Sequence, residues 1–212
     1  MIKIKAVLLL GGQSVRLPSN SPKPKQFLSL GSKSIYEHTL ETFKKSGLFS
    51  EIVLVTPKEH HLPGSVIGGK TRQESSYNGI KACGDKTDFV VIHDAVRPFV
   101  SLDILKKNID AVQIYKAVNT CIPSSDTIVY VENNKIVAIP KRSSCMRGQT
   151  PQSFAYELIL DAHKKTAQTN ATDDCSLVFE LGHPVHIVLG SEENFKITTP
   201  HDYLLALNYL KK

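Results

Sequence analysis

Ala6-Val7-Leu8-Leu9-Leu10-Gly11-Gly12 is the stretch of sequence that decides the fold. Five consecutive apolar residues closed by two glycines are typical of a β-strand that is buried on both faces. Two similar runs follow, Ile52-Val53-Leu54-Val55 and Phe89-Val90-Val91-Ile92. Helical patterns at 35–46 and 72–82 separate the three runs. Strands that alternate with helices predict an α/β fold with a doubly wound, mostly parallel sheet.

The alternation continues to the end of the chain, and we expect one domain over residues 1–212. Further helices are predicted at 102–113, 156–167 and 201–211, and further strands at 117–122, 185–189 and 195–199. The last of these strands contains Lys196, and a solvated lysine is the ordinary interpretation of that position.

A second pattern interrupts the alternation. Two apolar segments, 127–131 and 136–139, flank the polar turn Glu132-Asn133-Asn134-Lys135, which predicts a β-hairpin. We expect a protruding β-arm at about 125–150. Because two strands alone are only marginally stable in water, an arm this apolar should pack against a partner, and we expect a homodimer.

The composition excludes several classes of protein. The net charge is +6, but Lys and Arg are scattered and only 7% of the residues are aromatic, which argues against nucleic-acid binding. No apolar run approaches the roughly 20 residues that cross a membrane, and the first residues do not resemble a secretory signal. The four cysteines lie far apart, so neither zinc nor a disulfide framework is indicated. We expect a cytoplasmic protein.

Ligands of open parallel sheets bind at the carboxyl ends of the strands. The first such loop contains Gly11 and Gly12, followed by Arg16 and Lys25. Glycines let backbone N–H groups approach phosphate oxygens, and the two cations add positive charge. An ordinary tight turn with two surface cations remains the alternative on these residues alone.

The loop after the third strand is His93-Asp94-Ala95-Val96-Arg97-Pro98. Asp94 is well placed to hold Mg²⁺ against phosphate oxygens, and Arg97 could bind a further phosphate. A helix-capping Asp is the alternative. His93 and Asp94 are neighbours on a strand and point to opposite faces, so they do not form a His–Asp relay.

Residues 64–71, Gly-Ser-Val-Ile-Gly-Gly-Lys-Thr, match the P-loop pattern G-x-x-x-x-G-K-[ST]. A P-loop follows its strand directly, whereas here residues 58–63 intervene. Val66-Ile67 is better interpreted as a short strand that leads into Gly68-Gly69. A P-loop NTPase is therefore a remote alternative.

Taken in order, these motifs resemble the cytidylyltransferases that act on 2-C-methyl-D-erythritol 4-phosphate or D-ribitol 5-phosphate. The resemblance runs from Ala6 to Asp202. Its blocks are the Gly-Gly loop with Arg16, Pro24-Lys25-Gln26-Phe27, Gly68-Gly69 with Arg72 and Ser75, His93 to Pro98, Asp126-Thr127-Ile128, Arg142 with Gly148 to Gln152, Thr172-Asp173-Asp174, and Phe195-Lys196-Ile197-Thr198. Each block is weak alone, but their order across nearly the whole chain is specific.

The resemblance implies a Rossmann-like nucleotidyltransferase that binds CTP and a polyol phosphate, with Mg²⁺ as cofactor. It implies catalytic cations at Arg16, Lys25 and Lys196. It implies nucleotide binding by Gly11, Gly12, Gly68, Gly69, Ser75 and the metal ligand Asp94. It implies contacts to the polyol phosphate, shared between two subunits through the arm, by Arg97, Thr127, Arg142 and Thr150.

The two branches of this family differ in their acceptor. Gly148 before Gln-Thr-Pro-Gln, Val129 after Asp-Thr-Ile and the pair Asp174-Cys175 look more like the ribitol-phosphate branch. The short stretch from Pro57 to Gly68 looks more like the methylerythritol branch. We favour D-ribitol 5-phosphate on these residues.

Overall fold

The structure is a computed structural model that describes residues 2–11 and 23–211. Its centre is a seven-stranded sheet with the strand order β11-β7-β10-β6-β1-β4-β5. These strands are β1 (Ile4–Leu9), β4 (Glu51–Thr56), β5 (Val66–Ile67), β6 (Phe89–Asp94), β7 (Ala117–Pro123), β10 (Met146–Ala155) and β11 (His186–Leu189). Every pairing is parallel except those of β10 with β6 and β7, which confirms the predicted mostly parallel α/β sheet.

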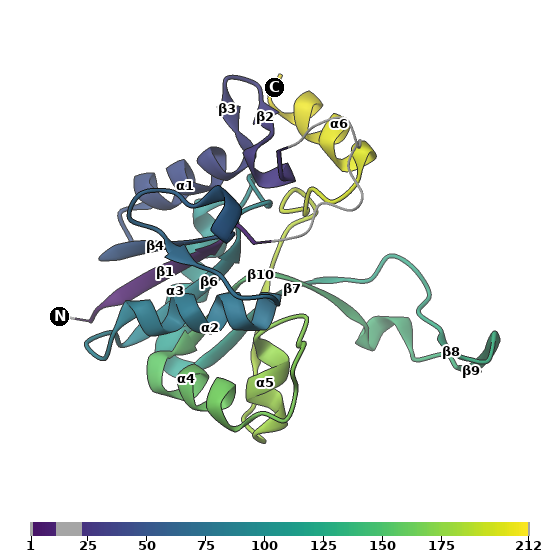
Figure 1. Ribbon diagram of the computed structural model, residues 1–212. Coiled ribbons are helices and arrows are strands. Elements are labelled where there is room, and N and C mark those ends of the chain that lie inside the picture. Colours follow the sequence, from purple (N-terminus) through teal and green to yellow (C-terminus); the bar gives the residue numbers. More distant parts are fainter. Residues whose placement is uncertain (1, 12–22, 212) are drawn as a thin grey trace.

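Helices cover both faces of the sheet (Figure 1). They are α1 (Ile35–Ser46), α2 (Arg72–Cys83), α3 (Leu102–Tyr115), α4 (Tyr156–Lys165), α5 (Cys175–Glu180) and α6 (Pro200–Tyr209). The short elements are η1 (Lys25–Phe27), β2 (Ser29–Leu30), β3 (Lys33–Ser34), η2 (Lys58–His60), β8 (Tyr130–Glu132), β9 (Lys135–Ala138) and η3 (Arg142–Ser144).

Strand β1 explains why the first apolar run decides the fold. Val7 and Leu9 point into the core beneath α2, α4 and α5, whereas Ala6 and Leu8 point into the core beneath α1 and α3. All four side chains are buried. Because alternate residues of a strand face opposite sides, a continuous apolar run is what a strand between two helix layers requires.

Strand β10 was not predicted. It contains Gly148, Gln149, Gln152 and Ser153, so its sequence lacks the apolar run that marks the parallel strands. It is nevertheless buried from Gln149 to Phe154, because its polar side chains form hydrogen bonds to strand β7, to helix α3 and to the loop after β11. Side-chain hydrogen bonding takes the place of hydrophobicity in this strand.

The predicted strand at 195–199 is wrong. The segment is irregular, and its backbone contact with the neighbouring loop is the hydrogen bond from Ile197 N to Val96 O, 2.9 Å long. Thr199 ends the segment as the N-cap of α6, where it accepts a hydrogen bond from Asp202 N. The buried Ile197 packs in a third apolar cluster with Leu30 and Ala206, and this packing, rather than sheet pairing, holds Lys196 in place.

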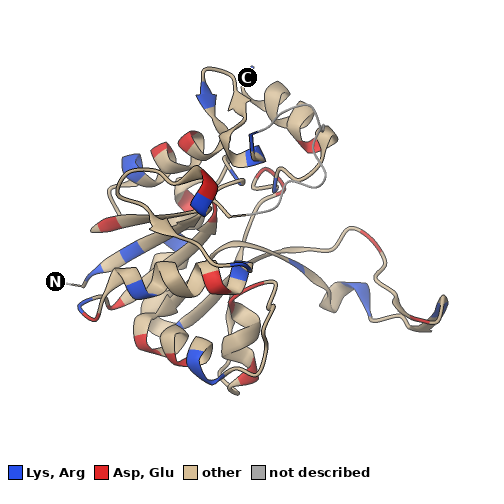
Figure 2. Ribbon diagram, in the orientation of Figure 1, with Lys and Arg blue, Asp and Glu red and all other residues tan. Residues whose placement is uncertain are grey.

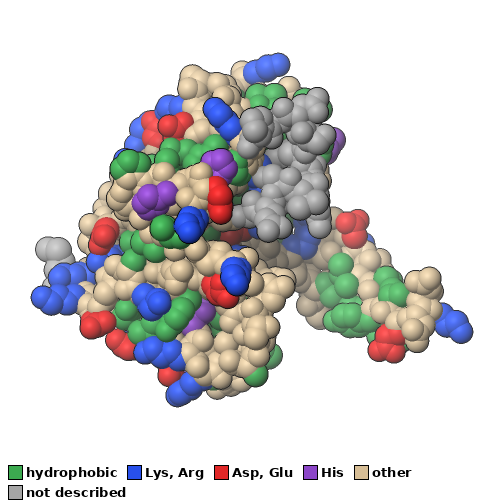
Figure 3. All heavy atoms as spheres, viewed as in Figure 1, with side chains coloured by type: hydrophobic (Ala, Val, Ile, Leu, Met, Phe, Trp, Pro, Cys, Tyr) green, Lys and Arg blue, Asp and Glu red, His purple; other side chains and the backbone are tan. Residues whose placement is uncertain are grey.

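The arm projects from the body of the molecule, and the β8–β9 hairpin lies at its tip (Figure 1). The strands are shorter than predicted, since residues 127–129 lie outside β8. Asn133 and Asn134 form the turn with φ values of 48° and 60°, a conformation that Asn tolerates. Apolar side chains gather on the arm (Figure 3), and Tyr130, Ile136 and Ile139 are about 60% exposed: 59%, 60% and 61%.

Positive and negative residues are interspersed over the ribbon (Figure 2). None of the helices that the structure describes is long and apolar enough to cross a membrane.

Candidate active site

The carboxyl ends of three parallel strands meet at one edge of the sheet. Leu9 at the end of β1 is in register with Asp94 of β6 on one side and with Val55 of β4 on the other. The chain leaves β1 toward β4 through α1 and returns to β6 through α2, so β1 lies at a topological switch point. Such a point leaves a crevice outside the strand ends, where ligands bind in open α/β sheets.

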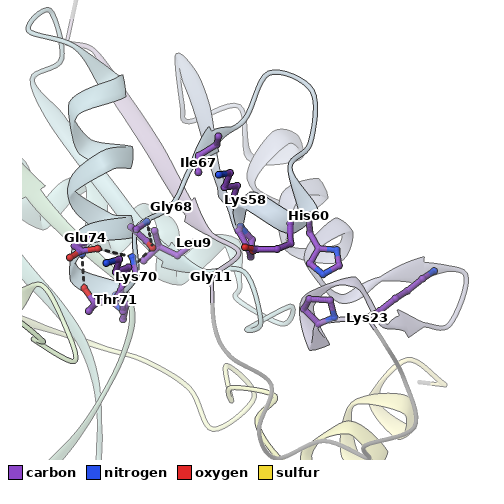
Figure 4. A pocket seen from close by; sticks show the side chains of 16 residues that line it. Leu9, Gly11, Lys23, Lys58, His60, Ile67, Gly68, Lys70, Thr71 and Glu74 are labelled. Carbon is purple, nitrogen blue, oxygen red and sulfur yellow. Dashed lines mark hydrogen bonds between the residues drawn. The ribbon is translucent and has the colours of Figure 1, made fainter.

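A pocket of ≈ 890 Å³ opens beside these strand ends. Figure 4 shows Gly68, Lys70 and Glu74 on one wall and His60 on the opposite one. The lining residues are Leu9, Gly11, Lys23, Pro24, Pro57, Lys58, Glu59, His60, Ile67, Gly68, Gly69, Lys70, Thr71, Arg72, Glu74 and Ser75. Gly11, Gly68, Gly69 and Ser75 were predicted to bind one nucleotide, and the structure brings all four into this pocket. Gly12 and Arg16 lie outside the described residues.

Ser75 organises this wall of the pocket. Its hydroxyl donates to Thr71 O (2.9 Å) and accepts from Gly69 N (3.1 Å), which ties the Gly-Gly turn to the first turn of α2. A Cβ at Gly68 would lie 2.8 Å from Ser75 Oγ, so this close approach requires glycine. A Cβ at Gly11 would lie 3.5 Å from the same oxygen. The loop after β1 and the start of α2 are therefore neighbours.

The P-loop alternative does not fit this geometry. Val66–Ile67 is strand β5, paired in parallel with the end of β4, and it lies inside the stretch that should be the phosphate loop. Thr71 is the N-cap of α2 and accepts a hydrogen bond from Glu74 N. Lys70 lines the pocket, which the sequence did not predict, but its side chain is exposed and its backbone N donates to Glu74 Oε2 (2.6 Å).

Asp94 is the centre of a cluster of charges next to the pocket. Its Oδ2 lies 2.8 Å from Lys196 Nζ, and its Oδ1 lies 3.5 Å from Arg72 Nε. Burial alone would raise the pKa of Asp94, but Lys196, Arg72 and Arg97 together hold it well below its ordinary value. Asp94 is therefore an ionised carboxylate at neutral pH, and the predicted pair Asp94 and Lys196, 102 residues apart, lies in direct contact.

The described residues contain no group of three or more His, Cys, Asp or Glu side chains that could hold a metal ion by themselves. Asp94 offers a hard carboxylate oxygen with a side-chain exposure of 10%. One carboxylate is what Mg²⁺ uses when most of its other ligands are phosphate oxygens and water. The donor set therefore fits a cation that arrives with a triphosphate, and it does not fit a metal held by protein ligands alone.

Thr150 and Arg97 lie behind Asp94 rather than in the open pocket. The hydroxyl of the buried Thr150 accepts a hydrogen bond from Asp94 N (3.1 Å) and contacts His93 Nδ1 (3.1 Å). Arg97 Nη1 donates to Asn194 O (2.8 Å), and burial lowers the pKa of Arg97 although the charge of Asp94 opposes this. Burial lowers the pKa of His93 to about 4, so this ring is neutral and takes part in packing.

Three further predicted site residues are not among those that line the pocket: Lys25, Thr127 and Arg142. Lys25 is the first residue of η1, and the next residue, the buried Gln26, donates to the backbone carbonyl of Leu10 at the end of the first apolar run. This bond holds η1 next to Leu10, and the residues just before η1, Lys23 and Pro24, line the pocket. Thr127 and Arg142 are exposed on the arm. The arm that carries both residues projects away from the body of the molecule, which contains β6 and its terminal residue Asp94 (Figure 1).

Two further residues join the pocket to the charge cluster. Arg72 lines the pocket, contacts Asp94 and donates from Nη1 to Asp174 Oδ2 (2.8 Å). Arg72 and Asp174 were part of the family resemblance, but the resemblance assigned no role to either residue. Their separation of 102 residues explains why no local pattern pairs them. The only local signal is weak: an arginine in the first turn of a helix is mildly unfavourable with respect to the helix dipole, which a nearby carboxylate offsets.

The fold is that of known nucleotide-transfer enzymes. It matches the crystal structure of 4-diphosphocytidyl-2C-methyl-D-erythritol synthase from Anaerococcus prevotii with a TM-score of 0.86 and 29% identity, over 100% of this chain and 97% of that one. It also matches the crystal structure of 2-C-methyl-D-erythritol 4-phosphate cytidylyltransferase from Thermus thermophilus with a TM-score of 0.80 and 30% identity, over 97% of this chain and 98% of that one. Fold and site together define a CTP-dependent nucleotidyltransferase.

The family model of 2-C-methyl-D-erythritol 4-phosphate cytidylyltransferase matches residues 4–212, and the chain belongs to this family. The enzyme of that name from Geotalea uraniireducens is 36% identical, over 99% of this chain and 97% of the relative. That from Thermosipho africanus is 39% identical, over 94% of each. Ribitol-5-phosphate cytidylyltransferase from Lactiplantibacillus plantarum is 37% identical over 99% of each.

Proposed function

We propose that this enzyme transfers the cytidylyl group of CTP to 2-C-methyl-D-erythritol 4-phosphate and releases diphosphate. The observation that carries the proposal is the junction of two features at one edge of the sheet. The pocket with Gly11, Gly68, Gly69 and Ser75 has room for a nucleoside, and Arg72 connects it to the cluster of Asp94 and Lys196. A cationic cluster beside a nucleoside pocket suits a triphosphate.

The reaction needs no covalent enzyme intermediate. A phosphate oxygen of the acceptor forms a bond to the α-phosphorus of CTP, while the bond from that phosphorus to the bridging oxygen breaks and diphosphate leaves with the electron pair. Lys25, Lys196 and Arg16 act by stabilising the negative charge of the transition state. Arg16 lies outside the described residues, and its role rests on the family resemblance alone.

Asp94 and phosphate oxygens of the nucleotide would hold a divalent cation such as Mg²⁺, which neutralises charge on the triphosphate when it is bound. Asp94 is ionised and holds Lys196 within 2.8 Å. The carboxylate therefore positions a positive charge at this edge of the sheet, whether that charge is the Lys196 ammonium or a bound divalent cation.

The arm supplies the acceptor side of a composite site. Thr127 and Arg142 are exposed on a segment that projects from its own body, and the arm carries exposed apolar side chains. A homodimer buries these side chains and places the arm residues of one subunit at the site of the other. The resemblance also assigns acceptor contacts to Arg97 and Thr150. Thr150 is buried against Asp94 and His93, so of the two we retain the half-buried Arg97 as a contact from the body of the protein.

Local residues favoured D-ribitol 5-phosphate as the acceptor, but one finding now favours methylerythritol phosphate. The matched family model and the relatives with 36% and 39% identity carry that acceptor in their names. Ribitol 5-phosphate remains the second candidate because of the relative with 37% identity that bears its name.

A coupled assay of diphosphate release tests the proposal. With CTP, Mg²⁺ and each acceptor in turn, we expect kcat/KM to be at least roughly tenfold higher for 2-C-methyl-D-erythritol 4-phosphate, the discrimination that a few pocket contacts supply. A preference for ribitol 5-phosphate would select the second candidate. Equal or faster turnover with ATP than with CTP would contradict both.

A further inference from the structure

Arg72 is shared unequally between two carboxylates. Its Nη1 lies 2.8 Å from Asp174 Oδ2, whereas its Nε lies 3.5 Å from Asp94 Oδ1. The first distance is that of a short, charge-assisted hydrogen bond, and the second is only an ion-pair contact. Asp174 is therefore the partner that fixes the guanidinium, and Asp94 is a neighbour that the guanidinium reaches from there.

Asp174 is itself held rigidly. It is fully buried, and its Oδ1 accepts from Ser76 Oγ (2.6 Å) and contacts His163 Nε2 (3.0 Å). Its backbone N donates to Gln152 Oε1 (3.0 Å) in the central strand β10. Burial would raise the pKa of Asp174, but Arg72, His163 and Ser76 lower it to about 2, so the group is an anion at neutral pH. The anchor of Arg72 is thus a fixed buried charge.

One donor of Arg72 remains unused. Its Nη2 is buried and has no hydrogen-bond partner among the described residues, although Arg72 lines the pocket. An unpaired buried donor on a charged group is costly, and a partner that binds there, such as a ligand, is one explanation for its retention. With Nη1 fixed by Asp174, the planar guanidinium leaves Nη2 in a defined position for an acceptor atom in the pocket.

We propose that Asp174 is a positioning residue, which holds Arg72 so that its free Nη2 donates to an oxygen of the bound CTP. This inference rests on the proposed function, since it takes CTP as the occupant of the pocket. It assigns no contact between Asp174 and the substrate. Loss of the anchor would let the guanidinium turn toward Asp94, so that Nη2 would no longer be held in one position.

The direct test is Asp174→Asn, which preserves shape but removes the charge. We expect KM for CTP to rise roughly tenfold with a much smaller change in kcat, because a contact made equally in ground and transition states affects KM alone. KM for the polyol phosphate should change less than twofold. The double variant with Arg72→Gln should have the same KM for CTP as Arg72→Gln alone, since Asp174 acts only through Arg72.

Ser76→Ala is the matched control. It removes a buried hydrogen bond to the same carboxylate but leaves the contact between Arg72 and Asp174 intact. We expect a lower Tm and an unchanged KM for CTP. Should Asp174→Asn fail to fold, Arg72→Lys tests the donor that Asp174 is proposed to position, because lysine retains the charge for Asp174 but lacks the second arm of the fork. A KM for CTP within twofold of the unmodified enzyme in that variant would overturn the proposal.

The outcomes separate the two proposals. If the unmodified enzyme releases no diphosphate with CTP and either acceptor, the proposed function fails. If it is active but Asp174→Asn has a KM for CTP within twofold of the unmodified enzyme, only the positioning role fails. Independent, multiplying effects of Asp174→Asn and Arg72→Gln on KM, or an equal rise of KM in Ser76→Ala, would also overturn the positioning role.

Discussion

At the scale of single residues, the chemistry depends on which cations surround Asp94. Lys196 and Arg72 contact its two oxygens, and Arg97 lowers its pKa from farther away. The strand-end rule predicted Asp94 and Gly11 at this edge of the sheet, because parallel strands bring their carboxyl ends together, whereas Gly68 and Gly69 were assigned through the family resemblance. The same rule could not find Arg72 and Asp174, since their contact joins a helix start to a loop 102 residues away.

Two lysines should matter for the chemical step. Lys25→Ala and Lys196→Ala are each expected to lower kcat by roughly 10²–10³, the usual effect of removing a preorganised donor for the transition state. Steady-state kinetics with both substrates measure this. Lys70→Ala is the comparison: Lys70 lines the pocket, but its side chain is exposed and the ion pairs of Asp94 are with Lys196 and Arg72, so we expect a much smaller effect on kcat. An essential Lys70 with a dispensable Lys25 would restore the P-loop interpretation.

Asp94→Asn should preserve the fold and weaken the dependence of the reaction on Mg²⁺. The amide lacks the charge that attracts a hard cation, so the Mg²⁺ concentration for half-maximal rate should rise about tenfold or more. A Mg²⁺ titration at saturating CTP measures this shift, and circular dichroism checks the fold. An unchanged titration would place the metal on other ligands.

At the scale of elements, apolar periodicity predicted those strands and helices whose faces are sorted by burial. Strand β1 and helix α1 are of this kind, and the predicted bounds of α1, 35–46, agree with the structure. Strand β10 was missed because polar side chains hydrogen bond inside the sheet, and residues 195–199 form no strand because tertiary packing of Ile197 holds them. Both cases depend on long-range contacts, which a local pattern does not contain.

Gly79 tests how closely α2 packs on the sheet. A Cβ there would lie 2.4 Å from Val7 Cγ1 and 2.7 Å from Val55 Cγ2. Gly→Ala within a helix normally stabilises by about 1 kcal/mol, but overpacking a tight core costs about 1–3 kcal/mol. We therefore expect Gly79→Ala to lower the free energy of unfolding, measured by urea denaturation. A stabilised variant would show that α2 shifts freely on β1 and β4.

At the scale of the whole molecule, the arm decides whether one chain contains a complete site. Its exposed apolar side chains, among them Val131 (54%) and Ile136 (60%), favour a partner, and Arg142 lies on it far from the pocket in sequence. The hairpin was predictable because its turn and its apolar strands are local features. The identity of its partner follows from no local feature and stays a prediction.

Mixing two inactive variants tests the composite site. In a heterodimer of Lys25→Ala and Arg142→Ala subunits, one site combines an intact Lys25 with an intact Arg142. Random exchange of equal amounts should then restore roughly a quarter of the original activity. Native mass spectrometry confirms the exchange. No recovery in proven heterodimers, or a monomer at working concentration, would return Arg142 to its own chain.

The most direct test of the central claim follows the α-phosphorus of CTP by ³¹P NMR in a reaction with 2-C-methyl-D-erythritol 4-phosphate and Mg²⁺. We predict that one diphosphate is released for each CDP-polyol formed, with the α-phosphorus in the new phosphoanhydride. We also predict that CTP stays intact without the acceptor. Release of inorganic phosphate and CDP, or CTP hydrolysis that ignores the polyol phosphate, would contradict the account.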